Sequence, residues 1–191
     1  MSKELYRVLI AGEGGQGIQL IAHVFARAAF NEGLNVAYLP NYGVEQRGGV
    51  SLAFLQIGTG IIGFPKFSKA DIIVNLRSRA VERVNEYIGD DTLYIYDSDL
   101  IESSELAQVT AEKLAISATS SASRKLEPKV FNMIMAGALL SEIDGITIKS
   151  LEAALDTELA DKYLKKPQLR HLNKKALEIG EKLAKEVYKA K

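Results

Sequence analysis

The stretch YRVLIAGEGGQGI, residues 6–18, decides the fold that the rest of the sequence must fit. Residues 6–11 form a short apolar run with β-branched side chains, which is typical of a buried strand. The glycine-rich run that follows, Gly12-Glu13-Gly14-Gly15-Gln16-Gly17, allows the backbone to turn tightly from a strand into a helix. The sequence therefore predicts a strand, a glycine turn and a helix in succession.

The residues after the glycines complete a β-α-β unit. Apolar residues recur at helical spacing on one face of the predicted helix, namely Ile18, Ile21, Ala22, Phe25 and Ala28. Gly33 stands where a helix commonly ends, and residues 36–39 then read as a second strand closed by Pro40. This order predicts a Rossmann-like first β-α-β unit.

The next segment interrupts the alternation of strands and helices. Residues 50–57 are strand-like, and Gly58-Thr59-Gly60 suggests a turn into a further strand at Ile61-Ile62. Two strands joined by so short a turn must be antiparallel. A mixed sheet is therefore expected.

Later segments supply the other layers of the fold. Strands are expected at residues 71–76 and 92–96, with a helix over residues 80–88 that Gly89 ends. A short helix is expected within residues 117–123, a stronger one from Pro128 to Gly145, and a terminal helix over residues 169–190. We predict a three-layer α/β/α fold with a mixed, mostly parallel sheet and C-terminal helices, in one domain over residues 1–191.

Composition excludes several classes of function. The chain has 191 residues, of which 24 Lys and Arg balance 24 Asp and Glu, so nucleic acid and anionic membranes are not expected partners. Cysteine is absent and histidine occurs only twice, which argues against disulfides, thiolate chemistry and a metal or iron–sulfur site within the chain. The N-terminus lacks the pattern of a secretory signal, and no apolar run approaches the ~20 residues of a membrane span. A cytoplasmic protein is expected.

The first glycine run satisfies the pattern G-x-G-x-x-G between a strand and a helix. Three interpretations stay open: a purely structural turn, contact with a phosphate-bearing ligand at the helix N-terminus, or a dinucleotide site. A dinucleotide site also needs an acidic residue at the end of the second strand, to bind the ribose. That strand ends in Leu39-Pro40-Asn41, and Glu45 lies beyond it.

A second loop, NYGVEQRGGVS at residues 41–51, is expected at the same edge of the sheet as the first. Its glycines allow close approach of a ligand or partner, and Arg47 offers a forked cation to a carboxylate or phosphate. The competing interpretation is a surface pair between Glu45 and Arg47 beside a glycine bend.

Other polar residues are weighed in the same way. Asn132 shares a helical face with apolar residues, so its amide is expected to bond the nearby loop backbone or, alternatively, a ligand or neighbouring subunit. Asp97 and Asp99 follow a strand and suit turn or N-cap chemistry better than a Mg²⁺ site.

The two loops together resemble the gamma subunit, or gamma domain, of 2-oxoacid:ferredoxin oxidoreductases. Shorter matches at Asn132-Met133, Gly137, Asn173 and Gly180 extend the resemblance over roughly residues 5–185. The resemblance implies no catalytic or metal-binding residue in this chain. It implies a cofactor-binding role for the residues of the two loops and for Asn132, that is Gly12, Gly14, Gly15, Gln16, Gly17, Tyr42, Glu45, Arg47, Gly48, Gly49, Ser51 and Asn132.

What the resemblance implies about function is a share in a larger enzyme. The family converts a 2-oxoacid, coenzyme A and oxidised ferredoxin to acyl-CoA, CO₂ and reduced ferredoxin. Thiamine diphosphate, Mg²⁺ and [4Fe-4S] clusters are then held by alpha, beta and ferredoxin-like delta subunits, while the gamma piece packs against them and approaches coenzyme A. The chain is expected to be inactive alone, and a homodimer stays open for it when isolated. Three different functions also stay open at this point: a small subunit of indolepyruvate oxidoreductase, a non-catalytic nucleotide-binding protein and a separate NAD(P) dehydrogenase.

Overall fold

The fold is built around one six-stranded sheet. The structure, a computed structural model, describes residues 3–42 and 49–190. In chain order the strands are β1 (Leu5–Glu13), β2 (Asn35–Tyr42), β3 (Val50–Gly58), β4 (Ala70–Asn75), β5 (Ile88–Asp97) and β6 (Glu112–Ile116). Across the sheet their order is β2-β3-β1-β4-β5-β6.

The sheet is mixed, as predicted, although the sequence suggested the wrong antiparallel pair. β1, β4, β5 and β6 pair in parallel, whereas β3 is antiparallel to β1 on one side and to β2 on the other. The strand expected at Ile61-Ile62 is wrong, because both residues lie in the loop between β3 and β4. β1 and β2 are parallel to each other but β3 lies between them, so the first β-α-β unit spans an inserted strand.

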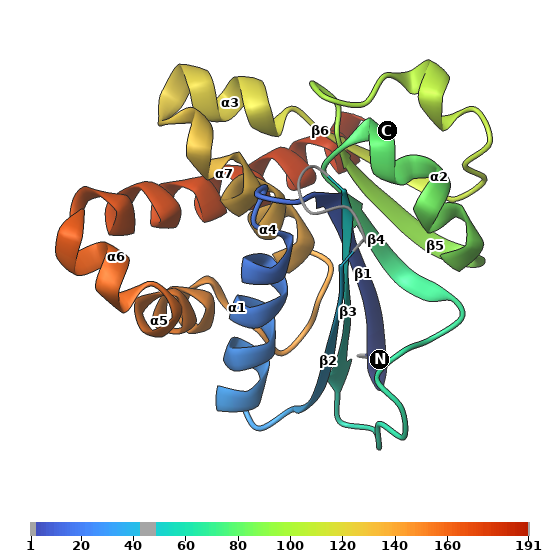
Figure 1. The fold of residues 1–191 in the computed structure, drawn as a ribbon, viewed down its shortest axis with the longest axis horizontal. Coiled ribbons are helices and arrows are strands. Elements are labelled where there is room, and N and C mark those ends of the chain that lie inside the picture. The colour runs from blue at the N-terminus through green and yellow to red at the C-terminus, as the bar shows by residue number, and fades with distance from the viewer. Residues whose placement is uncertain (1–2, 43–48, 191) are drawn as a thin grey trace.

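Helices cover both faces of the sheet, which confirms the three-layer architecture (Figure 1). α1, α4, α5 and α7 lie on one face, and the short α2 lies on the other. The bounds of the helices are α1 (Ile18–Asn31), α2 (Val81–Val84), α3 (Ala118–Lys125), α4 (Phe131–Leu140), α5 (Ile148–Glu158), α6 (Ala160–Lys165) and α7 (Gln168–Ala190). Short 3-10 turns occur at Ser78–Ala80, Asn85–Tyr87, Ser103–Leu106 and Pro128–Val130. No helix among the described residues is long and apolar enough to cross a membrane.

Two predicted helices differ from the structure in extent. The helix expected over residues 80–88 is only α2 with a 3-10 turn on each side, because Ile88 pairs with Ala70 and begins β5. The helix expected to reach Gly145 ends at Leu140, where the Ser141 hydroxyl donates a 2.7 Å hydrogen bond to the carbonyl oxygen of Ala138. The short helix α3 and the terminal helix α7 are confirmed.

Three elements were not predicted: β6, α5 and α6. A sequence signal for α5 was present, since Thr147 and Ser150 form a reciprocal capping box at its N-terminus. The Ser150 N–H donates to the Thr147 hydroxyl at 3.1 Å, and the Thr147 N–H donates to the Ser150 hydroxyl at 2.8 Å. The box fixes the point at which the chain enters α5.

α4 and α7 cross at a contact that only glycines allow. A Cβ atom at Gly137 would lie 2.1 Å from the carbonyl oxygen of Leu177, and one at Gly180 would lie 1.9 Å from that of Ile134. Both are far below any normal contact distance, so the two backbones touch directly. Two of the residues that carry the family resemblance therefore serve helix packing.

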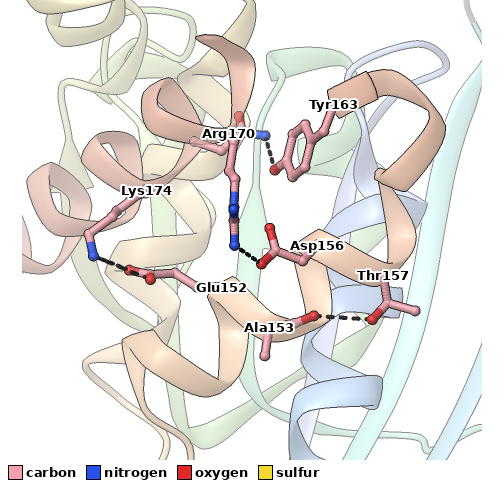
Figure 2. Close-up of polar contacts among 8 residues, drawn as sticks. Glu152, Ala153, Asp156, Thr157, Tyr163, Arg170 and Lys174 are labelled. Atoms are coloured by element: carbon pink, nitrogen blue, oxygen red, sulfur yellow. Dashed lines mark hydrogen bonds and ion pairs between the residues drawn. The ribbon is translucent and has the colours of Figure 1, made fainter. Parts of the chain in front are cut away.

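Polar contacts fasten α5 to α7 beside this crossing (Figure 2). Lys174 lies 3.2 Å from a carboxylate oxygen of Glu152, and Arg170 forms an ion pair with Asp156. The Asn173 amide, which is buried, donates a 2.9 Å hydrogen bond to the Tyr163 hydroxyl of α6. These contacts surround a hollow of about 340 Å³ whose acidic groups already have cationic partners, so they hold the corner together.

Candidate functional site

The carboxyl ends of β1 and β4 form the natural binding edge of this sheet. The chain leaves β1 toward α1 on one face and leaves β4 toward α2 on the other (Figure 1). Ligands of open α/β sheets collect where neighbouring connections diverge in this way. The loop Gly12–Gly17 lies at this point, between β1 and α1.

Gly12 and Gln16 shape the loop from within. A Cβ atom at Gly12 would lie 2.6 Å from Oε1 of Gln16 and 2.7 Å from Cδ1 of Ile18. Oε1 of Gln16 accepts a hydrogen bond from the Glu13 N–H at 2.8 Å, and the Gln16 N–H donates to the Glu13 carbonyl at 3.2 Å. Gln16 therefore braces the turn, and Gly12 makes room for it.

The outer part of the loop presents bare backbone. Gly14 and Gly15 are exposed, and Gly15 and Gly17 have φ values of 96° and 83°, which L side chains rarely adopt. α1 begins after Gly17 without a side-chain cap and without an acidic residue in its first turn. Among residues 3–42 and 49–190, no side chain caps the first N–H groups of α1, which is the condition for binding an anion.

Glu13 brings a negative charge to this loop, but a cation balances it. Nε of Arg77 lies 3.3 Å from a carboxylate oxygen of Glu13. Arg77 is held by the buried Asn75, whose Oδ1 accepts from the Arg77 N–H at 3.1 Å and whose amide donates to the Tyr94 hydroxyl at 2.7 Å. The sequence reasoning missed Arg77, although a cation two residues after a buried strand is a usable signal.

The second loop meets the first, as predicted. The Gly14 N–H donates to the Gly49 carbonyl at 3.1 Å, so both loops lie at one edge. Tyr42 ends β2 with 67% of its surface exposed. The predicted site residues Glu45, Arg47 and Gly48 lie outside the described residues, and their roles stay predictions.

Ser51 and Gln19 form a buried polar connection behind the loops. The Gln19 amide donates to the Ser51 hydroxyl and to the Leu52 carbonyl, each at 2.9 Å. Oε1 of Gln19 accepts from the Tyr38 hydroxyl at 2.5 Å. Burial raises the pKa of Tyr38 to about 12, so its hydroxyl stays protonated and keeps this donor role at neutral pH. Ser51 is therefore tied to α1 and faces the protein interior.

Asn132 brings the start of α4 to the same place. Its side-chain Nδ2 would lie 2.3 Å from a Cβ atom at Gly17, so the amide packs directly on the Gly17 backbone. Asn132 is buried with 8% of its surface exposed. Gly17 is thus required both by its backbone angle and by this contact.

Asp97 and Asp99 behave as turn residues, which confirms the expectation. The Asp99 N–H donates to Oδ1 of Asp97 at 3.1 Å, the Thr119 hydroxyl donates to Oδ2 at 2.6 Å, and the Ser120 N–H donates to Asp99 at 2.7 Å. Within residues 3–42 and 49–190, no three His, Cys, Asp or Glu side chains gather as metal ligands would.

These features define an α/β protein with a glycine-rich turn between its first strand and its first helix. Residues 7–183 match the family described as pyruvate ferredoxin/flavodoxin oxidoreductase, and the chain belongs to this family as a gamma-type subunit of a 2-oxoacid:ferredoxin oxidoreductase.

Two relatives support this assignment. The chain is 31% identical over 150 residues to "2-oxoglutarate synthase subunit KorC" of Methanocaldococcus jannaschii, covering 78% of this chain and 80% of the relative. It is 32% identical over 164 residues to "Pyruvate/ketoisovalerate oxidoreductases common subunit gamma" of Pyrococcus abyssi, covering 81% and 89%.

A solved structure of a larger relative contains the same fold. It is described as 2-oxoglutarate:ferredoxin oxidoreductase from Magnetococcus marinus with 2-oxoglutarate, coenzyme A and succinyl-CoA bound. The TM-score is 0.83 at 22% identity, over 96% of this chain and 32% of that one. The fold of this chain therefore occurs as one part of a longer polypeptide.

Proposed function

We propose that this chain holds a phosphate group of coenzyme A at the Gly12–Gly17 loop of an assembled 2-oxoacid:ferredoxin oxidoreductase. The reaction of the complex is 2-oxoacid, coenzyme A and oxidised ferredoxin to acyl-CoA, CO₂ and reduced ferredoxin. The observation that carries the proposal is the open N-terminus of α1, which has neither a side-chain cap nor an acid in its first turn.

The geometry of the loop suits a phosphate. Unpaired N–H groups and the positive end of the helix dipole both stabilise an anion at this position. Gly14 and Gly15 themselves bring no side chain to the exposed turn, and the ion pair with Arg77 offsets the negative charge of Glu13 beside it. Coenzyme A carries phosphate groups, and the solved structure from Magnetococcus marinus is described with coenzyme A bound.

A dinucleotide fits less well, because of the order of the strands. A ribose-binding acid stands at the end of the strand beside β1 in dinucleotide folds. Here the antiparallel β3 stands beside β1 on the side toward β2, and β2 lies two strand spacings from β1, roughly 10 Å. β2 also ends in Leu39, Pro40, Asn41 and Tyr42, none of which is acidic.

We place the redox chemistry in partner subunits: alpha, beta and a ferredoxin-like delta. The chain has no cysteine for an iron–sulfur cluster, so the [4Fe-4S] clusters must be held elsewhere. Thiamine diphosphate and Mg²⁺ are assigned to the same partners. The subunit alone is expected to show no turnover with any 2-oxoacid. The named relatives act on different 2-oxoacids, so the proposal is limited to the 2-oxoacid class.

Charge at Gly14 tests the coenzyme A site. Among the described residues, a Cβ atom there would meet only the Gly49 carbonyl, at 3.9 Å, so Gly14→Asp and Gly14→Asn should both fold. The aspartate repels a phosphate whereas the asparagine of the same shape does not. We expect Gly14→Asp to bind coenzyme A about tenfold or more weakly than Gly14→Asn, measured by calorimetry on the reconstituted complex.

The comparison of the two variants isolates charge from size. Both should melt at the temperature of the unmodified subunit, because residue 14 is exposed. Raising the salt concentration should narrow the difference in affinity. Equal affinities for the aspartate and asparagine variants would show that no phosphate lies at this loop.

A further inference from the structure

The loop between β3 and β4, residues 59–69, presents large apolar side chains to solvent at the end of the sheet far from the glycine loop. Ile61 is 95% exposed and Phe64 is 68% exposed. The loop lies beside Leu5, the first residue of β1, whereas the glycine loop begins within the last two residues of that strand (Figure 1). The nine residues of β1 separate the two regions by roughly 25 Å.

The first half of this loop is held firmly in place. The N–H groups of Thr59 and Gly60 both donate to the carbonyl of Glu4, at 3.0 and 3.2 Å. The Asn35 amide donates to the carbonyls of Thr59 and Gly60, at 3.3 and 3.1 Å. A Cβ atom at Gly58 would lie 2.1 Å from the Glu4 carbonyl, so the strands approach as closely as backbone allows.

The second half of the loop is held by contacts with the buried residues beneath it. The buried Gln56 amide donates to the carbonyls of Phe64 and Pro65, at 2.6 and 2.9 Å. Phe67 is buried and packs edge-on against Phe54 with ring centres 5.2 Å apart. The exposed side chains of Ile61 and Phe64 are therefore presented by a fixed backbone, which lowers the entropy cost of binding a partner.

A cationic hollow lies beside these side chains. It measures about 460 Å³ and is lined by Arg7, Lys66 and Lys69 but by no acidic side chain. The nearby Asp71 is already engaged by Lys3, at 2.7 Å, and by the Arg7 N–H. The Lys69 ammonium donates to the carbonyls of Glu86 and Ile88, and the Lys66 ammonium lies over the rings of Phe54 and Tyr87, so neither cation is balanced by a carboxylate of the hollow's lining.

From these observations we propose that Ile61, Phe64 and the hollow are a docking surface for a partner subunit of the oxidoreductase. The complementary segment carries an acidic side chain for the hollow and an apolar side chain for Ile61 and Phe64. Charge complementarity selects this occupant, and exposed apolar patches rimmed by charge mark protein interfaces. The concave hollow suits a protruding side chain better than the flat surface of a lipid bilayer. The inference rests on family membership and is independent of coenzyme A binding.

Two sets of variants test the surface in the complex reconstituted from its subunits. Ile61→Ser combined with Phe64→Ser removes the apolar contact, and Arg7→Gln and Arg7→Glu remove and reverse one charge. We expect the apolar double variant to weaken association of the subunits about 10- to 100-fold. Arg7→Glu should weaken it more than Arg7→Gln. Association is measured by surface-based binding kinetics, and the coenzyme A affinity of complex formed at saturation should not change.

Matched controls exist elsewhere on the chain. Leu164→Ser removes an equally exposed apolar side chain, 81% exposed on α6, and Lys182→Glu reverses an exposed charge on α7. Neither control should alter association of the subunits. Every variant should have the same melting temperature as the unmodified subunit. Unchanged association for the Ile61, Phe64 and Arg7 variants, or an equal loss in the controls, would overturn the proposal. Loss of binding to phosphatidylserine vesicles with unchanged association would overturn it in favour of a membrane contact.

Discussion

Asp97 shows how a single buried carboxylate fastens the end of β5 to the start of α3. It is fully buried, and its two oxygens accept hydrogen bonds from the Asp99 N–H and the Thr119 hydroxyl. Burial is the main reason that its pKa is raised above the usual value. The folded state therefore binds the proton of this carboxyl more tightly than the unfolded state does.

This imbalance predicts that Asp97→Asn stabilises the protein at neutral pH. Ionising Asp97 costs folding free energy as the pH rises from the usual aspartate pKa through the raised folded pKa, and the cost persists above it. Asparagine stays neutral, accepts from the Asp99 N–H through Oδ1 and donates to the Thr119 hydroxyl through Nδ2. The free energy of unfolding, from urea titrations, should be higher in the variant at pH 7 and converge on wild type in acid.

Asp97→Ala is the matched control for the hydrogen bonds. It leaves the Asp99 N–H and the Thr119 hydroxyl without their acceptor, which costs about 1–3 kcal/mol for each buried group left unsatisfied. This variant should be less stable than wild type at pH 7. An Asp97→Asn variant that is less stable at neutral pH than in acid, relative to wild type, would show that the carboxylate is needed in its charged form.

The residues of the candidate site were only partly predictable. The strand-to-helix position of Gly12 to Gly17 follows from local pattern, because glycine is needed wherever a backbone turns this tightly. A ligand contact of Gln16 and Ser51 stays a prediction, but the structure shows a role that was not predicted for either residue: Gln16 braces its own loop, and Ser51 is bonded to Gln19. Such roles depend on where a side chain turns after folding, which sequence spacing does not fix. Arg77 reaches Glu13 only because β4 lies beside β1.

At the scale of helices and strands, local patterns are predictable from the sequence, whereas pairings between distant segments are not. The amphipathic α1 and α7 were recognised because their apolar residues repeat at helical spacing. The placement of β3 between β1 and β2 was not, because strand order depends on pairings between residues far apart in sequence. Ile88 was assigned to a helix for the same reason, since its pairing with Ala70 overrides its local pattern.

The crossing of α4 and α7 makes a prediction about Gly180. Within a helix, Gly→Ala normally stabilises by about 1 kcal/mol. Here the new Cβ atom would lie 1.9 Å from the Ile134 carbonyl, so the helices must separate. Gly180→Ala should therefore lower the free energy of unfolding by about 1–3 kcal/mol or more, measured as a lower urea midpoint with an unchanged slope.

Gly63→Ala is the control for this substitution. In the part of the chain that the structure describes, nothing lies within 4 Å of a Cβ atom at Gly63, and its φ is not in the left-handed region. The control should be neutral, or more stable by up to about 1 kcal/mol because the unfolded chain loses freedom. Equal stability of the Gly180→Ala and Gly63→Ala variants would mean that α4 and α7 tolerate a wider separation.

At the scale of the whole molecule, one sheet supports two apolar cores. The larger core lies between the sheet and α1, α4, α5 and α7, and the smaller one lies on the opposite face. Consecutive residues of single strands enter different cores: Ile10 and Leu9 in β1, Leu55 and Phe54 in β3, and Ile95 and Tyr94 in β5. Because both cores are built on the same strands, unfolding of one core would disrupt the sheet that the other core needs.

This shared sheet predicts that residues 1–191 unfold as a single domain in one transition. Far-UV circular dichroism reports mainly the helices of the larger core. Near-UV dichroism reports tyrosines, since tryptophan is absent; Tyr87, Tyr94 and Tyr96 lie in the smaller core, and Tyr6 and Tyr163 lie in the larger one, so this signal reports the packing of both. The urea midpoints of the two signals should coincide. Phe54→Leu, a change within the smaller core, should lower both midpoints by the same amount. The two cores share their strands, so lost packing in one core destabilises the whole fold. A near-UV transition that splits into two steps in this variant, or that shifts without the far-UV transition, would mean that the chain is not one cooperative domain.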